Sequence, residues 1–258
     1  MIVSGVLSNK SINAASLTTI GAIGRNNATS NVTGVTLNTV RATQSGNSLS
    51  LMGVSPGGVF NGANAFDANN DTAGTAPNQK DVQASTATPS LSPTVFYSYL
   101  SFGKWFDCSG CNTTNEVGVT GGFVYGLATD PAAIPTSGTA TYTGSIRGQY
   151  VDAAGVVSER TRANLSSTAD FTARTVSFAT TGSITSSGTN AFVTNNALNM
   201  TGNLSYSAGS NQFTGVVTAT GLSGTATGKF FGPAAQEIGG VYMLQGSAGN
   251  HDGVFIGK

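Results

Sequence analysis

The chain has 258 residues, a formal net charge of zero and only 9% charged residues. That length allows one large all-β domain or two smaller ones, with enough residues to bury a sizeable core. The low charge argues against a nucleic-acid-binding protein, which needs a basic patch, and against electrostatic docking on an anionic membrane. The 35 glycines are typical of a protein with many short strands and turns.

No apolar run is long enough to cross a membrane as a helix. Residues 1–20 do not read as a signal peptide, because the start is not basic and Asn9, Lys10 and Asn13 interrupt the apolar residues. No cysteine lies near the N-terminus, so we expect no lipid anchor on this chain. The abundance of Asn, Ser and Thr is common in exported bacterial surface proteins, and we expect a secreted or cell-surface protein in its mature form.

Residues 1–90 show weak strand patterns, and Gly62–Pro89 is polar and reads as a long loop. Stronger signals follow. Thr94–Phe106 alternates and is aromatic, and Val117–Leu127 is a second segment of this kind. Because the two segments flank a short turn, we predict that they form a hairpin.

The turn holds the two cysteines of the chain, Cys108 and Cys111. A thioredoxin-like redox pair needs a helix after it, and Asn112–Asn115 is a poor helix start. A zinc site needs two further ligands, which a chain with one histidine can hardly supply. We therefore predict a local disulfide that pins the turn, in an oxidising compartment.

A break follows at Asp130–Pro135, whose two prolines cannot sit in a central strand. We place a domain boundary there, with an irregular β domain at residues 1–132 and a second domain at residues 133–258. The second domain shows about eight strands, the smallest number that gives a filled barrel interior. We predict an all-β protein whose C-terminal domain is an eight-stranded antiparallel β-barrel, closed when the last strand pairs with the strand near Tyr142.

Four stretches of this chain, in the right order, resemble one known family. Gly228–Tyr242 and Gly253–Lys258 resemble the closing strands of the barrel of bacterial transferrin-binding protein B and its relatives, which include hemophilin-type hemophores. Tyr99–Trp105 resembles the aromatic strand before that barrel, Ile134–Gly144 the link into its first strand, and Ala169–Val176 the hairpin that follows. The resemblance implies the barrel fold and an exported ligand-capturing protein, but the fold alone does not fix the ligand.

A catalytic site is not predicted. Ser247, His251 and Asp252 are too close in one turn to act as nucleophile, base and orienting acid. No nucleophile elbow and no phosphate-binding glycine loop before a helix is visible, so we expect no nucleotide cofactor. Glu237 follows a Gly-Pro turn, where we expect it to hydrogen-bond to backbone. We therefore expect a protein that is not an enzyme.

His251 is the single histidine and has two interpretations. It is either an axial ligand of heme iron held on a loop at the barrel rim, as in some hemophilin-like relatives, or a solvated loop residue beside the turn signal Asp252–Gly253. A heme site also needs an apolar slot. Aromatic residues near the first hairpin are candidates for that slot or for the core, and a Met or Tyr is the candidate second ligand. The predicted heme-binding set is His251, Tyr97, Tyr99, Trp105, Phe106 and Met243, with Met52 and Met200 as further ligand candidates.

The sequence supports two functions. The preferred one is capture of a small nutrient ligand, heme above all, and its delivery to an outer-membrane receptor. The alternative is a surface protein that binds a host or partner protein through its loops and edge strands.

Overall fold

The computed structural model describes residues 95–107, 119–186 and 191–258, together with short strands between residues 22 and 88. The chain divides into two compact units, Met1–Leu127 and Ala128–Lys258. The regular structure of the described residues is made of strands, apart from two single-turn 3-10 helices. None of the helical segments among these residues has the length and apolar character needed to span a bilayer.

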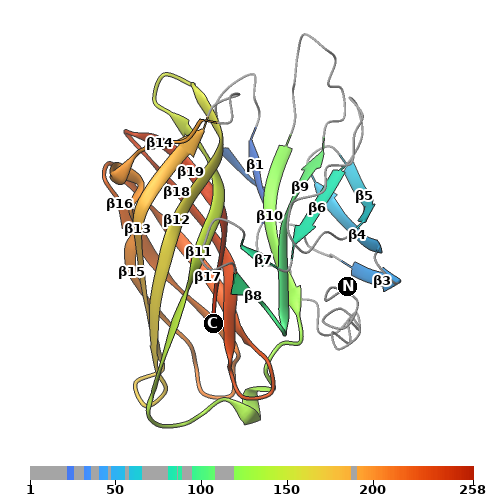
Figure 1. Cartoon of the computed structure of the whole chain (residues 1–258), viewed down its shortest axis with the longest axis vertical. Helices are drawn as coiled ribbons and strands as arrows, with labels where there is room; N and C mark the ends of the chain where they lie inside the picture. Colours follow the sequence, from blue (N-terminus) through green and yellow to red (C-terminus); the bar gives the residue numbers. More distant parts are fainter. Residues whose placement is uncertain are drawn as a thin grey trace. The chain divides into compact units, whose positions relative to one another are not determined.

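The first unit contains several small antiparallel sheets (Figure 1). In one of them β9 (Leu100–Asp107) pairs with β10 (Val119–Gly126), which confirms the predicted hairpin. The remaining strands of this unit are β1 (Ala22–Arg25), β2 (Val32–Val35), β3 (Arg41–Ser45), β4 (Ser48–Ser55), β5 (Gly58–Ala65), β6 (Asp81–Ser85), β7 (Ala87–Thr88) and β8 (Val95–Phe96).

Two details of the first unit differ from the sequence-based expectation. The aromatic segment is not one strand, because Tyr97–Tyr99 form an irregular link between β8 and β9. The polar stretch Gly62–Pro89 is not wholly a loop, since it holds the end of β5 and also β6, which pairs with β9. Strand β6 reads Asp-Val-Gln-Ala-Ser, an alternation too short and too polar to stand out.

The second unit is a closed eight-stranded antiparallel barrel, as predicted (Figure 1). Its strands follow one another around the barrel in chain order: β11 (Thr139–Asp152), β12 (Val157–Asp170), β13 (Thr175–Ser186), β15 (Thr201–Ser205), β16 (Gln212–Ala219), β17 (Leu222–Phe231), β18 (Glu237–Gly246) and β19 (Gly249–Gly257). The last strand pairs with the first, with Gly257 opposite Gly144, so the C-terminal strand closes the sheet two residues from Tyr142 as expected.

Three short elements join these strands. Helix η1 (Pro131–Ala133) begins at Asp130, whose Oδ1 accepts a hydrogen bond from the Ala132 backbone N–H at 2.9 Å. The proline-rich break that the sequence predicted is therefore a capped turn before the barrel. Strand β14 (Val193–Thr194) pairs with the end of β13, and helix η2 (Asn196–Leu198) leads on to β15.

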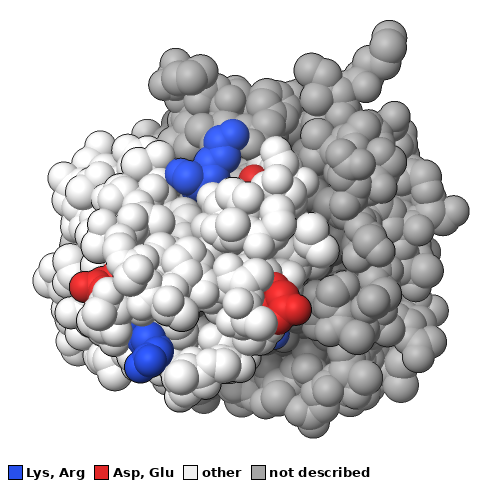
Figure 2. Space-filling model, turned by 90° about the horizontal axis from the view of Figure 1, so that it is seen from below, with Lys and Arg blue, Asp and Glu red and all other residues white. Residues whose placement is uncertain are grey.

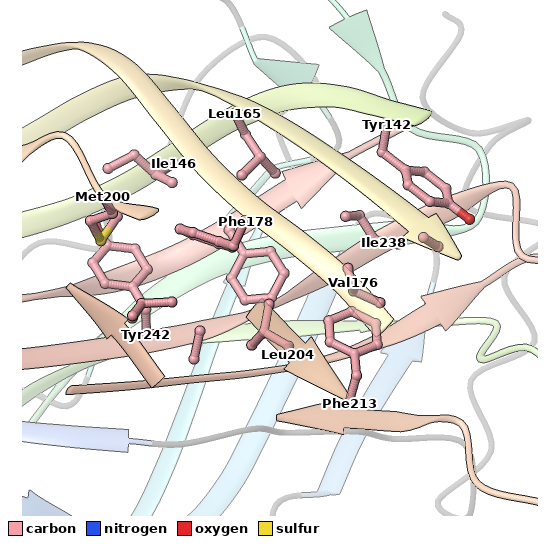
Figure 3. Close-up of a cluster of buried hydrophobic side chains, with 14 of the residues drawn as sticks. Tyr142, Ile146, Leu165, Val176, Phe178, Met200, Leu204, Phe213, Ile238 and Tyr242 are labelled. Atoms are coloured by element: carbon pink, nitrogen blue, oxygen red, sulfur yellow. The ribbon is translucent and has the colours of Figure 1, made fainter. Parts of the chain in front are cut away.

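Strict alternation gives each barrel strand an inner and an outer face. In β16, Phe213 and Val217 are fully buried, whereas Thr214, Val216 and Thr218 are exposed. The inward side chains meet in one continuous hydrophobic core (Figure 3). Such a core is the filled interior expected of a small barrel.

Candidate functional site

One end of the barrel interior is packed with aromatic rings, and we call it the aromatic end. Phe230 lies at its centre and is fully buried. The Phe230 ring centroid lies 5.0 Å from that of Phe213, 5.4 Å from Tyr206, 5.9 Å from Phe171 and 6.4 Å from Tyr142. Tilted and edge-on contacts at these distances are the favourable arrangements of aromatic pairs. The aromatic end is therefore closed by side chains.

The hydroxyl of Tyr142 is satisfied within this packing. It donates a hydrogen bond to the Ala235 carbonyl oxygen at 2.7 Å. Burial raises the pKa of Tyr142 far above its usual value, so the hydroxyl keeps its proton and remains a donor.

The other end of the interior holds buried polar groups, and we call it the polar end. His251 is fully buried there. Its Nε2 lies 3.0 Å from Thr161 Oγ1 and 3.0 Å from the Tyr242 hydroxyl, while Nδ1 has no hydrogen-bond partner. The Tyr150 ring meets the imidazole edge-on at 6.2 Å. In Figure 3, Tyr242 and Tyr142 lie toward opposite ends of the core, with Phe178 between them.

Burial fixes the charge of this histidine. It lowers the pKa of His251 to about 3, because the low-dielectric interior disfavours the imidazolium. The ring is therefore neutral at pH 7, with one N–H donor and one lone pair. A neutral imidazole between two hydroxyls is a structural hydrogen-bonding group of the barrel interior.

Two inward-facing glycines make room for these polar groups. A Cβ on Gly148 would lie 2.4 Å from the Tyr242 hydroxyl oxygen, and one on Gly253 would lie 2.8 Å from it. Each would also approach backbone atoms of the neighbouring strand within 2.2 Å. A glycine inside a strand often marks such a close approach, and this was the signal in the sequence that could have located the polar end.

The predicted rim-loop position of His251 is wrong. The residue lies within β19, opposite Leu244 of β18 and Tyr150 of β11, and it points into the barrel. The turn that joins β18 and β19 is at Ser247–Ala248, several residues earlier. The pair Asp252–Gly253 imitates a hairpin turn, but here the glycine serves the close approach to β11. The solvated-loop interpretation fails for the same reason.

The structure does not bring His251 and Met243, two of the predicted heme ligands, together. Met243 is opposite Asp252 on the outer face of the wall, whereas His251 is on the inner face. Met200 is buried in the core. Asp252 points away from His251 and accepts a hydrogen bond from Gln149 Nε2 at 3.5 Å. His251 and Met243 therefore do not face a common slot.

The other predicted residues belong to the first unit. Tyr97 is fully buried and its ring meets Phe102 edge-on at 6.2 Å, while Tyr99 is partly exposed. Trp105 and Phe106 lie in β9, where the backbone alone is described; they are opposite Gly121 and Thr120 of β10. Met52 likewise lies in β4. Cys108 and Cys111 lie outside the described residues, so their disulfide stays a prediction.

Within the described residues, no three His, Cys, Asp or Glu side chains gather in a way that could hold a metal ion. Glu237 is buried at the start of β18, opposite Phe231 of β17. The interior therefore has two packed ends and one neutral imidazole. The side chains that a binding partner could reach lie on the outer surface.

The outer surface carries few charges. Seen from below, most of the described surface is uncharged, with a few basic and acidic groups (Figure 2). The sequences of β13, β15 and β16 contain no charged residue, and their outward positions are mostly Thr, Ser and Asn. Val216 in β16 is 62% exposed.

One part of this wall differs, at the start of β12. The guanidinium carbons of Arg160 and Arg162 lie 5.9 Å and 4.6 Å from the centroid of the Phe192 ring. Val193, the next residue, is 66% exposed, but it is opposite Thr185, which is opposite the inward-facing Thr161, so it lies on the other face of the sheet. This group was not predicted from the sequence, because it joins residues some thirty positions apart. The spacing Arg-x-Arg on an alternating strand was the available signal, since it puts both side chains on one face.

The comparisons with known proteins agree with the architecture. Residues 134–258 match the family model described as the C-lobe and N-lobe beta barrels of Tf-binding protein B. The second unit is therefore a transferrin-binding protein B-like β-barrel. A comparison with curated proteins finds no match.

Two solved structures of transferrin-binding protein B show the same fold. A single-site variant of the protein from Haemophilus parasuis Hp5 is 18% identical, with a TM-score of 0.52 over 93% of this chain and 45% of that one. Intact Ap-TbpB, with N and C lobes, is also 18% identical, with a TM-score of 0.52 over 93% of this chain and 46% of that one. The chain thus spans less than half the length of these proteins.

Proposed function

We propose that the protein binds a partner protein through the exposed loops and outer wall of its barrel, at a bacterial cell surface and in the service of iron acquisition. The observation that carries this proposal is the filled interior of the barrel. The side chains of Tyr142, Phe178, Phe213, Phe230 and Tyr242 are at most 2% exposed and occupy the space that a ligand would need.

A small-molecule site is a concave pocket of several hundred cubic ångströms that covers most of its ligand. Eight-stranded barrels hold either their own side chains or one small ligand. Here Phe230 and its neighbours fill the aromatic end, and His251 and Tyr242 are fully buried at the polar end. Since the interior is filled, a binding site should lie on the outside of the barrel, and loops on a rigid scaffold are the usual place for such a site.

The family supports a protein partner. Its description names a transferrin-binding protein, and the two similar structures carry that name. Transferrin is therefore the first partner to test. The chain spans less than half of those proteins, so the binding of transferrin by this chain is part of the proposal.

Heme capture and delivery to an outer-membrane receptor stay predictions from the sequence. Ligation of heme iron by His251 would require the barrel wall to open, because the imidazole is fully buried and its Nε2 contacts Thr161 and Tyr242. This requirement is why we prefer the protein partner.

Biolayer interferometry with the immobilised full chain tests the proposal. Iron-loaded transferrin is the analyte, and serum albumin is the control protein. We expect saturable binding of transferrin and none of albumin. The absence of transferrin binding, together with saturable binding of hemin by the same chain, would contradict the proposal and favour the small-ligand function.

A further inference from the structure

The segment that leads into the barrel passes its aromatic end, and we call residues 128–134 the strap. Ala128 is opposite Phe231 at the end of β17, whereas β11 begins at Thr139. Strands β18 and β19 separate β17 from β11 in the sheet, so the chain must pass the ends of both strands to reach β11. Figure 1 shows this passage along the lower end of the barrel. The strap therefore borders the aromatic end of the interior.

Thr129 fastens the start of the strap with its backbone and its side chain. Its N–H donates to the Phe230 carbonyl oxygen at 3.0 Å, and its hydroxyl donates to the Gly232 carbonyl oxygen at 2.7 Å. Its own carbonyl oxygen accepts a hydrogen bond from Asn211 Nδ2 at 2.6 Å. Thr129 is 2% exposed, and hydrogen bonds shielded from water in this way are stronger than exposed ones. We call Thr129 and Asn211 the clamp.

The clamp also holds the central residue of the aromatic end. Asn211 Oδ1 accepts a hydrogen bond from the Phe230 N–H at 2.8 Å, and Asn211 Nδ2 donates to the Phe230 carbonyl oxygen at 3.0 Å. Both backbone polar groups of Phe230 are therefore bonded to the clamp. Four other rings pack around the ring of this residue. Loss of the clamp would thus loosen the strap and the backbone that carries the central ring together.

The rest of the strap has little buried surface. Residues 130–133 are exposed, and Asp130 accepts hydrogen bonds from N–H groups of the strap itself. Ile134 is 7% exposed and belongs to the hydrophobic core. Gly138 follows with a φ of 82°, and a Cβ added there would meet nothing within 4 Å, so the backbone has room to move at this point. Segments with few buried apolar contacts open at a lower free energy than the whole domain.

We propose that the strap is a latch on the aromatic end of the barrel. While Thr129 and Asn211 hold it, Ile134 completes the core and the end is closed. When the clamp releases, the strap lifts about Gly138 and exposes apolar surface around Phe230, while the rest of the barrel stays folded. The clamp consists of an amide, a hydroxyl and backbone groups, which do not titrate near neutral pH. Opening of the latch is therefore independent of pH, in contrast to the polar end.

Hydrogen exchange of the full chain, followed residue by residue with NMR, tests the latch. In the wild type, the hydrogen-bonded amides of Thr129 and Phe230 should exchange faster than those of β18, because the strap opens locally. Thr129→Val removes the hydroxyl bond to Gly232 and should speed exchange of these two amides about fivefold, as expected for one buried hydrogen bond. Thr180→Val is the matched control, since the buried Thr180 hydroxyl accepts a hydrogen bond from the Met200 N–H at 2.7 Å in another part of the barrel.

A second variant, Asn211→Ala, should speed the exchange of the Thr129 amide more than Thr129→Val does, because it removes more of the clamp. It should also raise the fluorescence of anilinonaphthalene sulfonate, a dye that binds exposed apolar surface. Far-UV circular dichroism checks that each variant is folded. Faster exchange of the Thr129 and Phe230 amides in the clamp variants but not in Thr180→Val supports the latch. Exchange of these amides as slow as that of β18 in the wild type, or equal acceleration by Thr180→Val, would overturn it.

Discussion

The two ends of one barrel interior solve the packing problem in different ways. At the aromatic end, Phe230 is surrounded by four rings, and the hydroxyl of Tyr142 has a backbone acceptor. At the polar end, His251 meets two hydroxyls but keeps one ring nitrogen without a partner. Burial of apolar surface stabilises the folded state, whereas an incompletely paired polar group costs free energy. The aromatic end should therefore contribute most to the stability of the barrel, and the polar end should make that stability depend on pH.

The largest expected effect is at the aromatic end. Phe230→Ala should destabilise the barrel by about 3–5 kcal/mol, since it removes a fully buried ring and leaves a cavity among four others. Chemical denaturation followed by circular dichroism measures this. Val216→Ala, on the outer wall, is the control and should change stability by at most about 0.5 kcal/mol. Equal effects of the two substitutions would mean that the rings do not form a common core.

The second effect is a pH dependence from the polar end. The folded pKa of His251 is about 3, against about 6.5 in the unfolded chain. Above pH 6.5 both states are neutral and stability is unaffected. As the pH falls below 6.5 the unfolded state takes up a proton first, so stability falls until the folded pKa is reached. Between pH 6.5 and 4.5 the loss should be about 2 kcal/mol.

The single histidine of the chain makes this pH dependence easy to assign. Proton NMR of the folded protein should show no imidazole titration between pH 7 and 5. The variant His251→Gln, which has no titrating ring, should show a flatter dependence of denaturation midpoint on pH over the same interval. An imidazole that titrates near pH 6.5 in the folded protein would contradict the buried position.

A smaller effect is expected from a single hydroxyl of the polar end. Tyr242→Phe removes a hydrogen-bonding group from His251 Nε2 and should destabilise the barrel by about 1 kcal/mol. Tyr142→Phe is the matched deletion at the aromatic end, where it leaves the Ala235 carbonyl without this donor. Thermal unfolding of both variants against wild type gives the comparison. An unchanged midpoint for Tyr242→Phe would show that the hydroxyl is not part of the buried network.

Much of the barrel could be predicted because its signals are local and repeated. Most of the strands could be predicted from hydrophobic alternation, from glycine-rich turns and from the turn near Ala173. Strand β12 ends before that turn and β13 begins after it. The closure between β19 and β11 followed from strand number and from the family resemblance. Alternation reports which residues face inward, and in β16 it does so for Phe213 and Val217.

The polar end and the group that Phe192 forms with Arg160 and Arg162 could not be predicted from the sequence, for a physical reason. Both depend on register between strands far apart in the chain, such as Tyr150 opposite His251 and Arg162 opposite Ile184. A shift of one residue in register moves a side chain to the other face of the sheet. The pair Asp252–Gly253 showed the limit most clearly, since a turn signal lay inside a strand.

The filled interior is tested most directly by titrating the full chain with hemin and recording the Soret absorbance. A barrel closed by Phe230 at one end and by His251 and Tyr242 at the other has no slot for a porphyrin, so we expect no saturation at one equivalent. His251→Ala should leave the titration unchanged while lowering stability, because the imidazole is buried. A sharpened, shifted Soret band at one equivalent of hemin that is altered in His251→Ala would contradict the filled interior and restore heme as the ligand.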